Sequence, residues 1–187
     1  MDADEVLRPG RRDDLPELLE TIGTAAESDL RPPYLSDEGD PLLYYRRVLR
    51  MPKGTMGYRN TIIHQWNGVM TGFTVAAPLA TFDNYLDGAI PAKIALDRWG
   101  DLKAVLNWNI IVVKPEFRRK KITYKLFSEV MKRARKENYK YITGQLWIDN
   151  QASKKMLERC EFEFFYEKKV DFKIIGERTF CFCDYKL

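Results

Sequence analysis

Two neighbouring segments of the chain are rich in β-branched and aromatic residues. They cover residues 61–66 and 69–76, and Asn67-Gly68 stands between them. Asn-Gly is the favoured pair for a two-residue type I′ turn, because both of its positions require a positive φ. The pattern therefore predicts a β-hairpin over residues 61–76.

Apolar residues spaced three and four apart predict the helices. The clearest case is residues 121–138, where the apolar side chains share one face and the basic side chains the other. The other expected helices are one that carries Leu15, Leu18, Leu19 and Ile22 with Asp13 or Asp14 as its cap, one over residues 41–49, a helical piece at 92–99 inside the long stretch 79–102, and one that Asp149-Asn150 opens and that runs to Arg159.

Shorter apolar runs predict five more strands, over residues 5–7, 106–113, 141–148, 162–170 and 178–185. Strands and helices are interleaved along the chain, which is typical of an α/β fold. A length of 187 residues fits a single domain that spans residues 1–187.

The formal net charge of +4 is unevenly distributed. Residues 1–40 carry twelve acidic and four basic side chains, a local net charge of −8, whereas residues 114–136 carry ten basic and two acidic ones, a local net charge of +8. Such a basic stretch is compatible with a solvated helix face, a nucleic-acid patch or a seat for a phosphorylated small molecule.

The basic stretch begins where the strand at 106–113 leads through a short turn into the helix at 121–138. Free backbone N–H groups and the helix dipole favour an anion at a helix N-terminus. Four consecutive cationic side chains, Arg118 to Lys121, are unfavourable at that end of a helix unless a bound anion compensates their charge. We therefore expect an anion site here, and a diphosphate suits the four charges.

The remaining chemistry-bearing residues are few. His64 is the only histidine, which excludes multi-histidine metal sites, and we expect no metal; its position on a strand favours a structural role over that of a general base. The three cysteines, Cys160, Cys181 and Cys183, form no disulfide framework and are expected to be reduced thiols of a cytoplasmic protein. Cys160 is a less favoured candidate nucleophile. No apolar run approaches the ~20 residues of a membrane helix, and the acidic N-terminus is unlike a signal peptide.

Two motifs resemble signatures of the GNAT superfamily of acyl-CoA-dependent N-acyltransferases. The first is Val113-Lys114-Pro115-Glu116-Phe117-Arg118-Arg119-Lys120-Lys121-Ile122-Thr123, which is similar to the acyl-CoA-binding motif of that family. The second is NQASKKMLERCEF, residues 150–162, similar to the Asn-x-x-Ala-x-x-x-Tyr-x-x-x-Gly-Phe signature. The resemblance covers essentially the whole chain and implies a mixed sheet of about seven strands flanked by about four helices.

The resemblance also implies a cosubstrate, acetyl-CoA or another acyl-CoA, and residues that bind it. The backbone of the strand end would bind the pantetheine arm, the basic turn would hold the pyrophosphate, and the start of the second motif would touch the cosubstrate. The residues concerned are Ile111, Val112 and Val113 on the strand, Arg118, Arg119, Lys120, Lys121, Ile122 and Thr123 in the turn, and Asn150 and Ser153 in the second motif.

The chain departs from the family pattern at several positions. Two family glycines fall on Lys121 and Thr123, the alanine falls on Ser153, and the last glycine falls on Glu161. The tyrosine usually credited with protonating the leaving thiolate falls on Leu157, which has no proton to donate.

The catalytic residues are correspondingly weakly marked. The position of the glutamate base in some members falls at or near Asn107, and neither Asn107 nor Asn109 is a base. A strand N–H near Val112 would polarise the thioester carbonyl, and a water chain to Asp149, Asp101 or acidic loop residues would take the proton. The candidate catalytic residues are therefore Asn107, Asn109 and Asp149.

Three functions follow. The first is direct transfer of an acetyl group from acetyl-CoA to a small-molecule or protein amine. The second is a non-catalytic acyl-CoA-binding protein, suggested by Leu157 and the missing glycines. The third is a nucleic-acid-binding module, disfavoured because no stacking aromatic motif accompanies the basic run. Residues 79–102 have two equal interpretations: they wall a pocket for the acceptor amine, or they form the packed underside of a loop. The residues concerned are Phe82, Asp83, Tyr85, Asp87, Asp97 and Trp99. The aromatic-rich C-terminal hairpin offers an edge for a homodimer.

Overall fold

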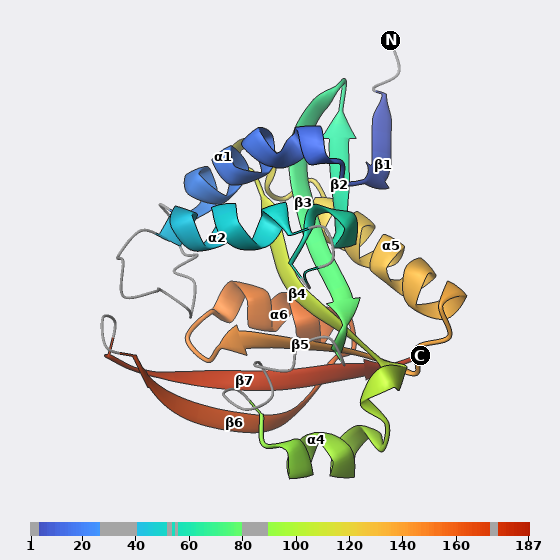
Figure 1. Cartoon of the computed structure of the whole chain (residues 1–187), viewed down its shortest axis with the longest axis vertical. Coiled ribbons are helices and arrows are strands. Elements are labelled where there is room, and N and C mark those ends of the chain that lie inside the picture. Colours follow the sequence, from blue (N-terminus) through green and yellow to red (C-terminus); the bar gives the residue numbers. More distant parts are fainter. Residues whose placement is uncertain (1–3, 27–40, 52–53, 55, 80–89, 173–175) are drawn as a thin grey trace. The chain divides into compact units, whose positions relative to one another are not determined.

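The computed structural model describes residues 4–26, 41–51, 54, 56–79, 90–172 and 176–187. Its strands are β1 (Glu5–Pro9), β2 (Thr61–Trp66), β3 (Val69–Pro78), β4 (Val105–Val113), β5 (Tyr141–Trp147), β6 (Glu163–Phe172) and β7 (Gly176–Lys186). Its helices are α1 (Leu15–Ala26), α2 (Pro41–Arg50), α4 (Ala92–Trp99), α5 (Ile122–Lys136) and α6 (Gln151–Arg159) (Figure 1). The described residues thus hold the five helices that the apolar pattern predicts, whereas the family resemblance implied about four.

The seven strands form one mixed sheet in the order β1-β2-β3-β4-β5-β7-β6. The first three strands are antiparallel neighbours, and so are β5, β7 and β6, whereas β4 and β5 run parallel. A parallel pair needs a crossover connection, and α5 provides it between β4 and β5. The mixed α/β fold expected from the sequence is confirmed.

The β2–β3 hairpin turns at the predicted dipeptide. Asn67 has φ 51° and Gly68 has φ 77°, the pair of positive values that a type I′ turn requires. Trp66 and Val69 face each other at the end of the ladder. The turn predicted from the sequence is therefore confirmed.

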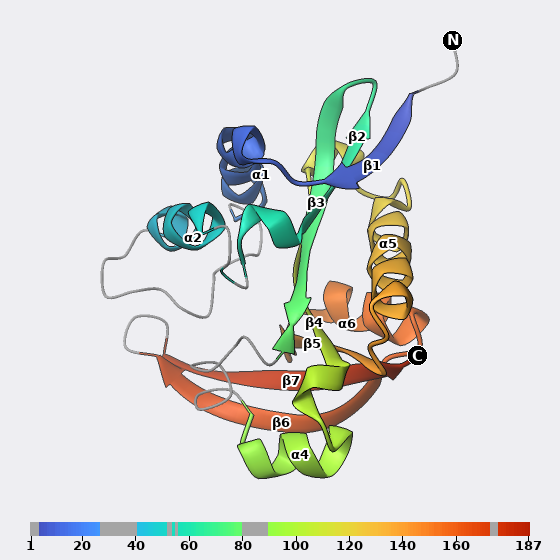
Figure 2. The same ribbon diagram turned by 45° about the vertical axis from the view of Figure 1, so that its right-hand side comes forward.

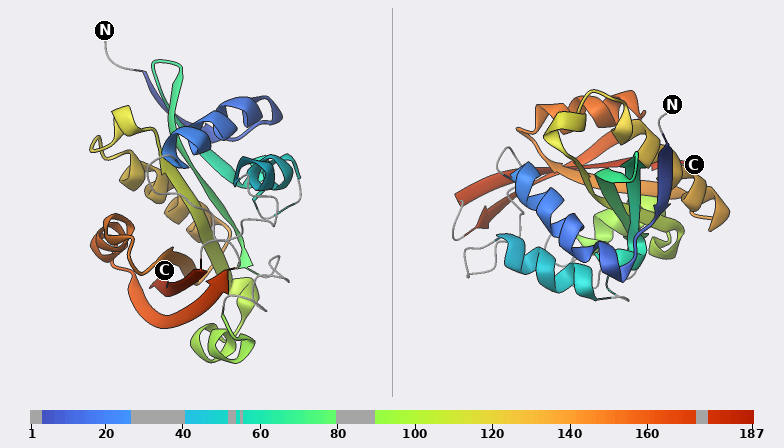
Figure 3. Two further views of the ribbon diagram at one scale, coloured as in Figure 1. Left: turned by 90° about the vertical axis from the view of Figure 1, so that its left-hand side faces the viewer. Right: turned by 90° about the horizontal axis from the view of Figure 1, so that it is seen from above.

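The chain forms two compact units, of which the first consists of Met1–Ala77 and Asn109–Lys132. Within it, α1 and α2 cover one face of the strands and α5 lies on the other (Figures 2 and 3). The buried core on the α1–α2 side is formed by Leu18, Ile22, Tyr45, Leu49, Met56, Ile63, Met70, Phe73, Val75, Ile110 and Val112. The apolar face of α1 predicted from the sequence meets alternate residues of β4, Ile110 and Val112, in this core.

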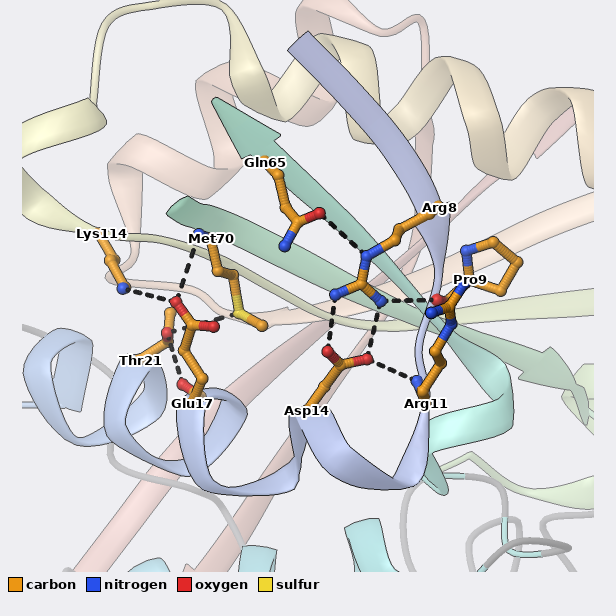
Figure 4. A network of polar contacts seen from close by, with 9 residues as sticks. All are labelled: Arg8, Pro9, Arg11, Asp14, Glu17, Thr21, Gln65, Met70 and Lys114. Carbon is orange, nitrogen blue, oxygen red and sulfur yellow. Dashed lines mark hydrogen bonds and ion pairs between the residues drawn. The ribbon is translucent and has the colours of Figure 1, made fainter. Parts of the chain in front are cut away.

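Polar contacts fix the edges of this unit (Figure 4). Arg8 of β1 forms a forked ion pair with Asp14 at 2.8 and 2.6 Å, and Asp14 also accepts the Arg11 N–H at 2.6 Å. Glu17 of α1 accepts hydrogen bonds from the Met70 N–H and from the Lys114 ammonium, both at 3.3 Å. The start of α1 is thereby tied to β1, and its next turn to β3 and to the end of β4.

A second set of contacts centres on His64, which is fully buried on β2. Its Nδ1 lies 2.6 Å from Thr71 Oγ1, and its Nε2 lies 2.6 Å from Glu5 Oε1. Lys125 of α5 donates to the same Glu5 oxygen. Both ring nitrogens are thus engaged within the protein, which fits the structural role expected for His64.

The second unit consists of Pro78–Trp108 and Arg133–Leu187. Asp184 of β7 is 3% exposed and accepts hydrogen bonds from Arg98 Nε at 2.9 Å, Arg98 Nη2 at 3.0 Å and Trp99 Nε1 at 2.7 Å. Arg98 also reaches Glu163 of β6 at 2.7 Å, and its guanidinium lies over the Phe165 ring. These contacts fasten the C-terminal end of α4 to the β6–β7 hairpin.

All three cysteines are buried free thiols. Cys181 and Cys183 lie two residues apart on β7, where desolvation raises both pKa values, that of Cys181 to about 11. Burial likewise raises the pKa of Cys160. A thiol with a raised pKa is a poor nucleophile, so the observations favour the packing role over the acyl-relay role of Cys160. None of the helices within the described ranges is long and apolar enough to span a membrane.

Candidate functional site

The predicted anion site lies in the first unit, where β4 leads into α5. β4 ends at Val113, a 3₁₀ turn covers Pro115–Phe117, and α5 begins at Ile122. Lys114 is held at the start of this connection, because its N–H donates to the Thr71 carbonyl at 2.9 Å and its ammonium contacts Glu17. The residues that follow, 118–121, form the loop that precedes α5, and we refer to residues 118–123 as the basic loop.

The basic loop leaves a row of backbone donors without partners. Arg119 and Lys121 have left-handed φ values of 66° and 61°, and the Lys121 carbonyl accepts the N–H groups of Tyr124 and Lys125 at 3.1 and 3.2 Å. Among the described residues, no acceptor is found for the backbone N–H groups of residues 119–123. Five free donors beside the positive end of the α5 dipole make a favourable anion site.

The side-chain charges of the basic stretch separate into two groups. Four cations have acidic partners: Lys114 with Glu17, Lys125 with Glu5, Lys132 with Glu129, and Arg133 with Glu137. Arg119, Lys120 and Lys121 form no ion pair with any described residue, and neither do Arg135 and Lys136 in the last turn of α5. Three of these five cations are adjacent in the basic loop, which favours a compact anion there over an extended polyanion.

At the end of β4, the backbone N–H and C=O groups point alternately toward β3 and away from it. The Lys114 N–H bonds to Thr71 of β3, and a Cβ added to Gly72 of β3 would meet the Val112 carbonyl at 2.6 Å. Because backbone groups alternate sides along a strand, Val112 directs its N–H and C=O toward β3, and Ile111 and Val113 direct theirs away from it. The groups available to a ligand on that other side are those of Ile111 and Val113.

The three candidate catalytic residues lie in different surroundings. Asn107 is 3% exposed, and its Nδ2 has no hydrogen-bond partner among the described residues. It lines a cavity of about 10 Å³ with Trp99 and Thr143, space for about one water molecule. Asn109 is half-buried on β4, and Asp149 is exposed after β5. Asp101 caps a 3₁₀ turn by accepting the Lys103 N–H at 2.9 Å.

Asn150 and Ser153 contact each other at the start of α6. Asn150 is the N-cap residue, and its Oδ1 accepts the Ser153 N–H at 3.0 Å. This bond satisfies one free donor of the helix and agrees with the expectation that Asp149-Asn150 opens it. The carboxamide NH₂ of Asn150 is the donor that remains for a ligand.

The structure shows the surroundings of two residues that depart from the family pattern, Glu161 and Leu157. Glu161 has φ 63° directly after α6, and the Phe162 N–H returns to the Leu157 carbonyl at 3.0 Å, so Glu161 occupies the left-handed position of a helix end where glycine is favoured. Leu157 is 5% exposed and belongs to the packed core. The side chain of Leu157 has no proton to donate.

The predicted acceptor wall lies partly outside the described residues. Phe82, Asp83, Tyr85 and Asp87 are not described. Trp99 is described and is turned inward to Asp184. The structure adds two residues that the sequence did not mark: Glu17, which holds Lys114, and Trp66, whose ring lies beside Lys120. Both contacts join residues far apart in the sequence, so no local pattern indicates them.

Comparison with known proteins identifies the architecture. The model of the acetyltransferase (GNAT) family matches residues 29–162. No curated protein matches the chain by sequence.

Solved structures resemble the whole chain at low sequence identity. The ribosomal-protein-alanine N-acetyltransferase from Brucella melitensis has a TM-score of 0.70 and 17% identity over 97% of this chain and 99% of that one. Salmonella typhimurium yncA, solved with its cofactor acetyl-CoA, has a TM-score of 0.67 and 16% identity over 98% and 94%. An N-acetyltransferase from Staphylococcus aureus Mu50 has a TM-score of 0.66 and 17% identity over 98% of each chain.

Proposed function

Because the chain belongs to the GNAT family of acetyltransferases, we propose that it transfers an acetyl group from acetyl-CoA to a primary amine. The observation that carries the proposal is the basic loop, with five unpartnered backbone N–H groups and three cations that have no acidic partner. A pyrophosphate supplies the acceptor oxygens and the negative charge that this arrangement lacks.

The ligand would extend from the loop along β4. The N–H and C=O groups of Ile111 and Val113 would pair with the amides of the pantetheine arm, as a short added strand does. Arg118 to Thr123 would hold the pyrophosphate. Acceptors in the family range from small amines to proteins, and either class is compatible with the residues described here.

The reaction would proceed by direct attack in a ternary complex. The amine nitrogen bonds to the thioester carbonyl carbon, the carbon–sulfur bond breaks, the amine gives up a proton to water and the sulfur leaves as thiolate. A free thiol has a pKa of about 8.5, so its thiolate is a tolerable leaving group without a dedicated acid. A backbone N–H of β4 would polarise the carbonyl, which needs no special side chain.

A specific observation favours a second candidate, a protein that binds acyl-CoA without catalysing transfer. Leu157 is buried where the family has its tyrosine, and Asn107 and Asn109 are not bases. In this case the basic loop would bind the same ligand, but no acetyl group would leave it.

Two measurements test these candidates in turn. A ligand that binds only the folded state at about 100 times its Kd stabilises it by about 2.7 kcal/mol, so acetyl-CoA should raise the thermal midpoint by roughly 5–10 °C. No shift at millimolar acetyl-CoA contradicts both. Release of free thiol with a panel of polyamines, amino sugars, amino acids and lysine peptides then supports the transferase, and binding without release supports the second candidate.

A further inference from the structure

An aromatic pair holds the side chain of Lys120 in the middle of the basic loop. Its ammonium nitrogen lies 5.0 Å from the centroid of the Trp66 ring and 4.9 Å from that of the Phe117 ring. Trp66 is the last residue of β2 and Phe117 is the last residue of the 3₁₀ turn. Two rings from separate segments thus attract one exposed cation.

Lys120 stands between the two strained residues of the loop. Arg119 and Lys121, with φ values of 66° and 61°, adopt a conformation that is unfavourable for any residue with a Cβ. Such conformations persist only where the surroundings impose them. The family pattern uses glycine at position 121, where the conformation carries no such penalty, whereas this chain needs another source of constraint.

The free donors depend on the same conformation. The N–H groups without partners belong to residues 119–123, so their directions are set by the backbone on both sides of Lys120. A loop that left the left-handed conformation at 119 or 121 would point these groups apart. Holding the Lys120 side chain therefore preserves the directions of the donors on either side of it.

We propose that Trp66 is a positioning residue for acyl-CoA binding, which acts by holding Lys120 together with Phe117 so that the basic loop is preorganised. The inference rests on the proposed function for its ligand. Arg119 and Lys121 remain as the cations free to meet the phosphates, and the ammonium of Lys120 is committed to the rings. Binding is tighter when the loop does not have to be ordered by the ligand.

A double-mutant cycle with acetyl-CoA as the probe tests the inference. W66L keeps the apolar bulk but removes the aromatic face, W66F keeps a face, and K120M keeps the length of the side chain but removes its charge. One exposed cation–π contact corresponds to roughly a two- to fivefold change in Kd. We expect about this loss in W66L and in K120M, no further loss in the double variant, and near wild-type binding in W66F.

The controls separate preorganisation from charge and from folding. K103M removes an exposed positive charge of the second unit and should bind like the wild type. Amide ¹⁵N relaxation of ligand-free protein should show larger amplitudes of motion at residues 119–121 in both W66L and K120M. This measurement needs no ligand. Because K120M changes an exposed side chain, the measurement on K120M remains valid even if W66L folds poorly.

Three outcomes would overturn the inference. If K120M weakened acetyl-CoA binding and W66L did not, Lys120 would contact the phosphates directly. Full additivity of W66L and K120M would mean that the two side chains act independently. Unchanged loop relaxation in both variants would mean that the rings do not order the loop. If the wild type did not bind acetyl-CoA, the proposed function would be contradicted. The relaxation measurement would still show whether Trp66 and Lys120 order the ligand-free loop.

Discussion

Glu161 shows at the scale of one residue how this chain departs from its family. It keeps the left-handed backbone of a helix end, φ 63°, without the glycine that usually allows it. E161G should remove the penalty of that conformation, offset in part by the added freedom of the unfolded chain, and stabilise the protein by about 0.5–1 kcal/mol in urea unfolding.

The neighbouring E158G provides the matched control for this prediction. Glu158 lies within α6, where glycine is unfavourable, so the same change should destabilise the protein by about 0.5–1 kcal/mol. If E161G were neutral or destabilising, the left-handed assignment of Glu161 would be wrong.

Asp184 is a buried acid of the second unit, with Arg98 and Trp99 as its hydrogen-bond donors. D184N removes its charge and leaves the Arg98 and Trp99 donors poorly matched, which should cost about 2–4 kcal/mol in urea unfolding. E163Q removes the other, exposed partner of Arg98 and should change stability little. Equal effects of the two substitutions would contradict the anchoring role of Asp184.

The anchoring of β1 gives a prediction at the scale of an element. Hydrogen bonds from Lys125 and then His64 lower the pKa of Glu5. A carboxyl with a lowered pKa stabilises the fold above its unfolded pKa of about 4.3, and this stabilisation is lost as the pH falls through the folded value.

The stability gap between the wild type and E5Q should therefore be largest at neutral pH and close as the pH falls below about 4. Urea unfolding of both proteins across this range measures it. Asp14, whose pKa the Arg8 fork lowers, is present in both proteins and so cancels in the difference. A gap that is independent of pH would show that the Glu5 contacts do not stabilise the charged form.

The elements themselves were largely predictable from sequence. Local signals fix the Asn67-Gly68 turn and the apolar faces of α1 and α5, because each signal lies within a few residues of what it specifies. The pairings of β4 with β5 and of β5 with β7 join residues distant in the sequence, and only the family resemblance implied them. The contacts of Lys114 with Glu17 and of Lys120 with Trp66 escaped prediction for the same reason.

At the scale of the whole molecule, the distribution of charge bears on function more than its sum. A net charge of +4 says little, but several cations of residues 114–136 have acidic partners, whereas three that have none stand together in the basic loop. The sequence predicts an anion site in this stretch, and the finding that Arg119, Lys120 and Lys121 have no acidic partner among the described residues required the structure.

Charge reversal tests that distribution. R119E/K121E should weaken acetyl-CoA binding by at least tenfold, because two attractive charges near the phosphates become repulsive, while circular dichroism remains unchanged. K93E/K103E makes the same change in net charge at exposed positions of the second unit and should bind almost as the wild type does. Equal losses in the two variants would indicate long-range attraction without a site at the loop.

The most direct test of the central claim is a titration of ¹⁵N-labelled protein with acetyl-CoA, followed residue by residue. The account predicts saturable shifts that are largest for the backbone amides of residues 119–123, with smaller shifts at Ile111 and Val113 and none of comparable size around the buried His64. No saturable shift at millimolar acetyl-CoA, or shifts concentrated away from the basic loop, would contradict it.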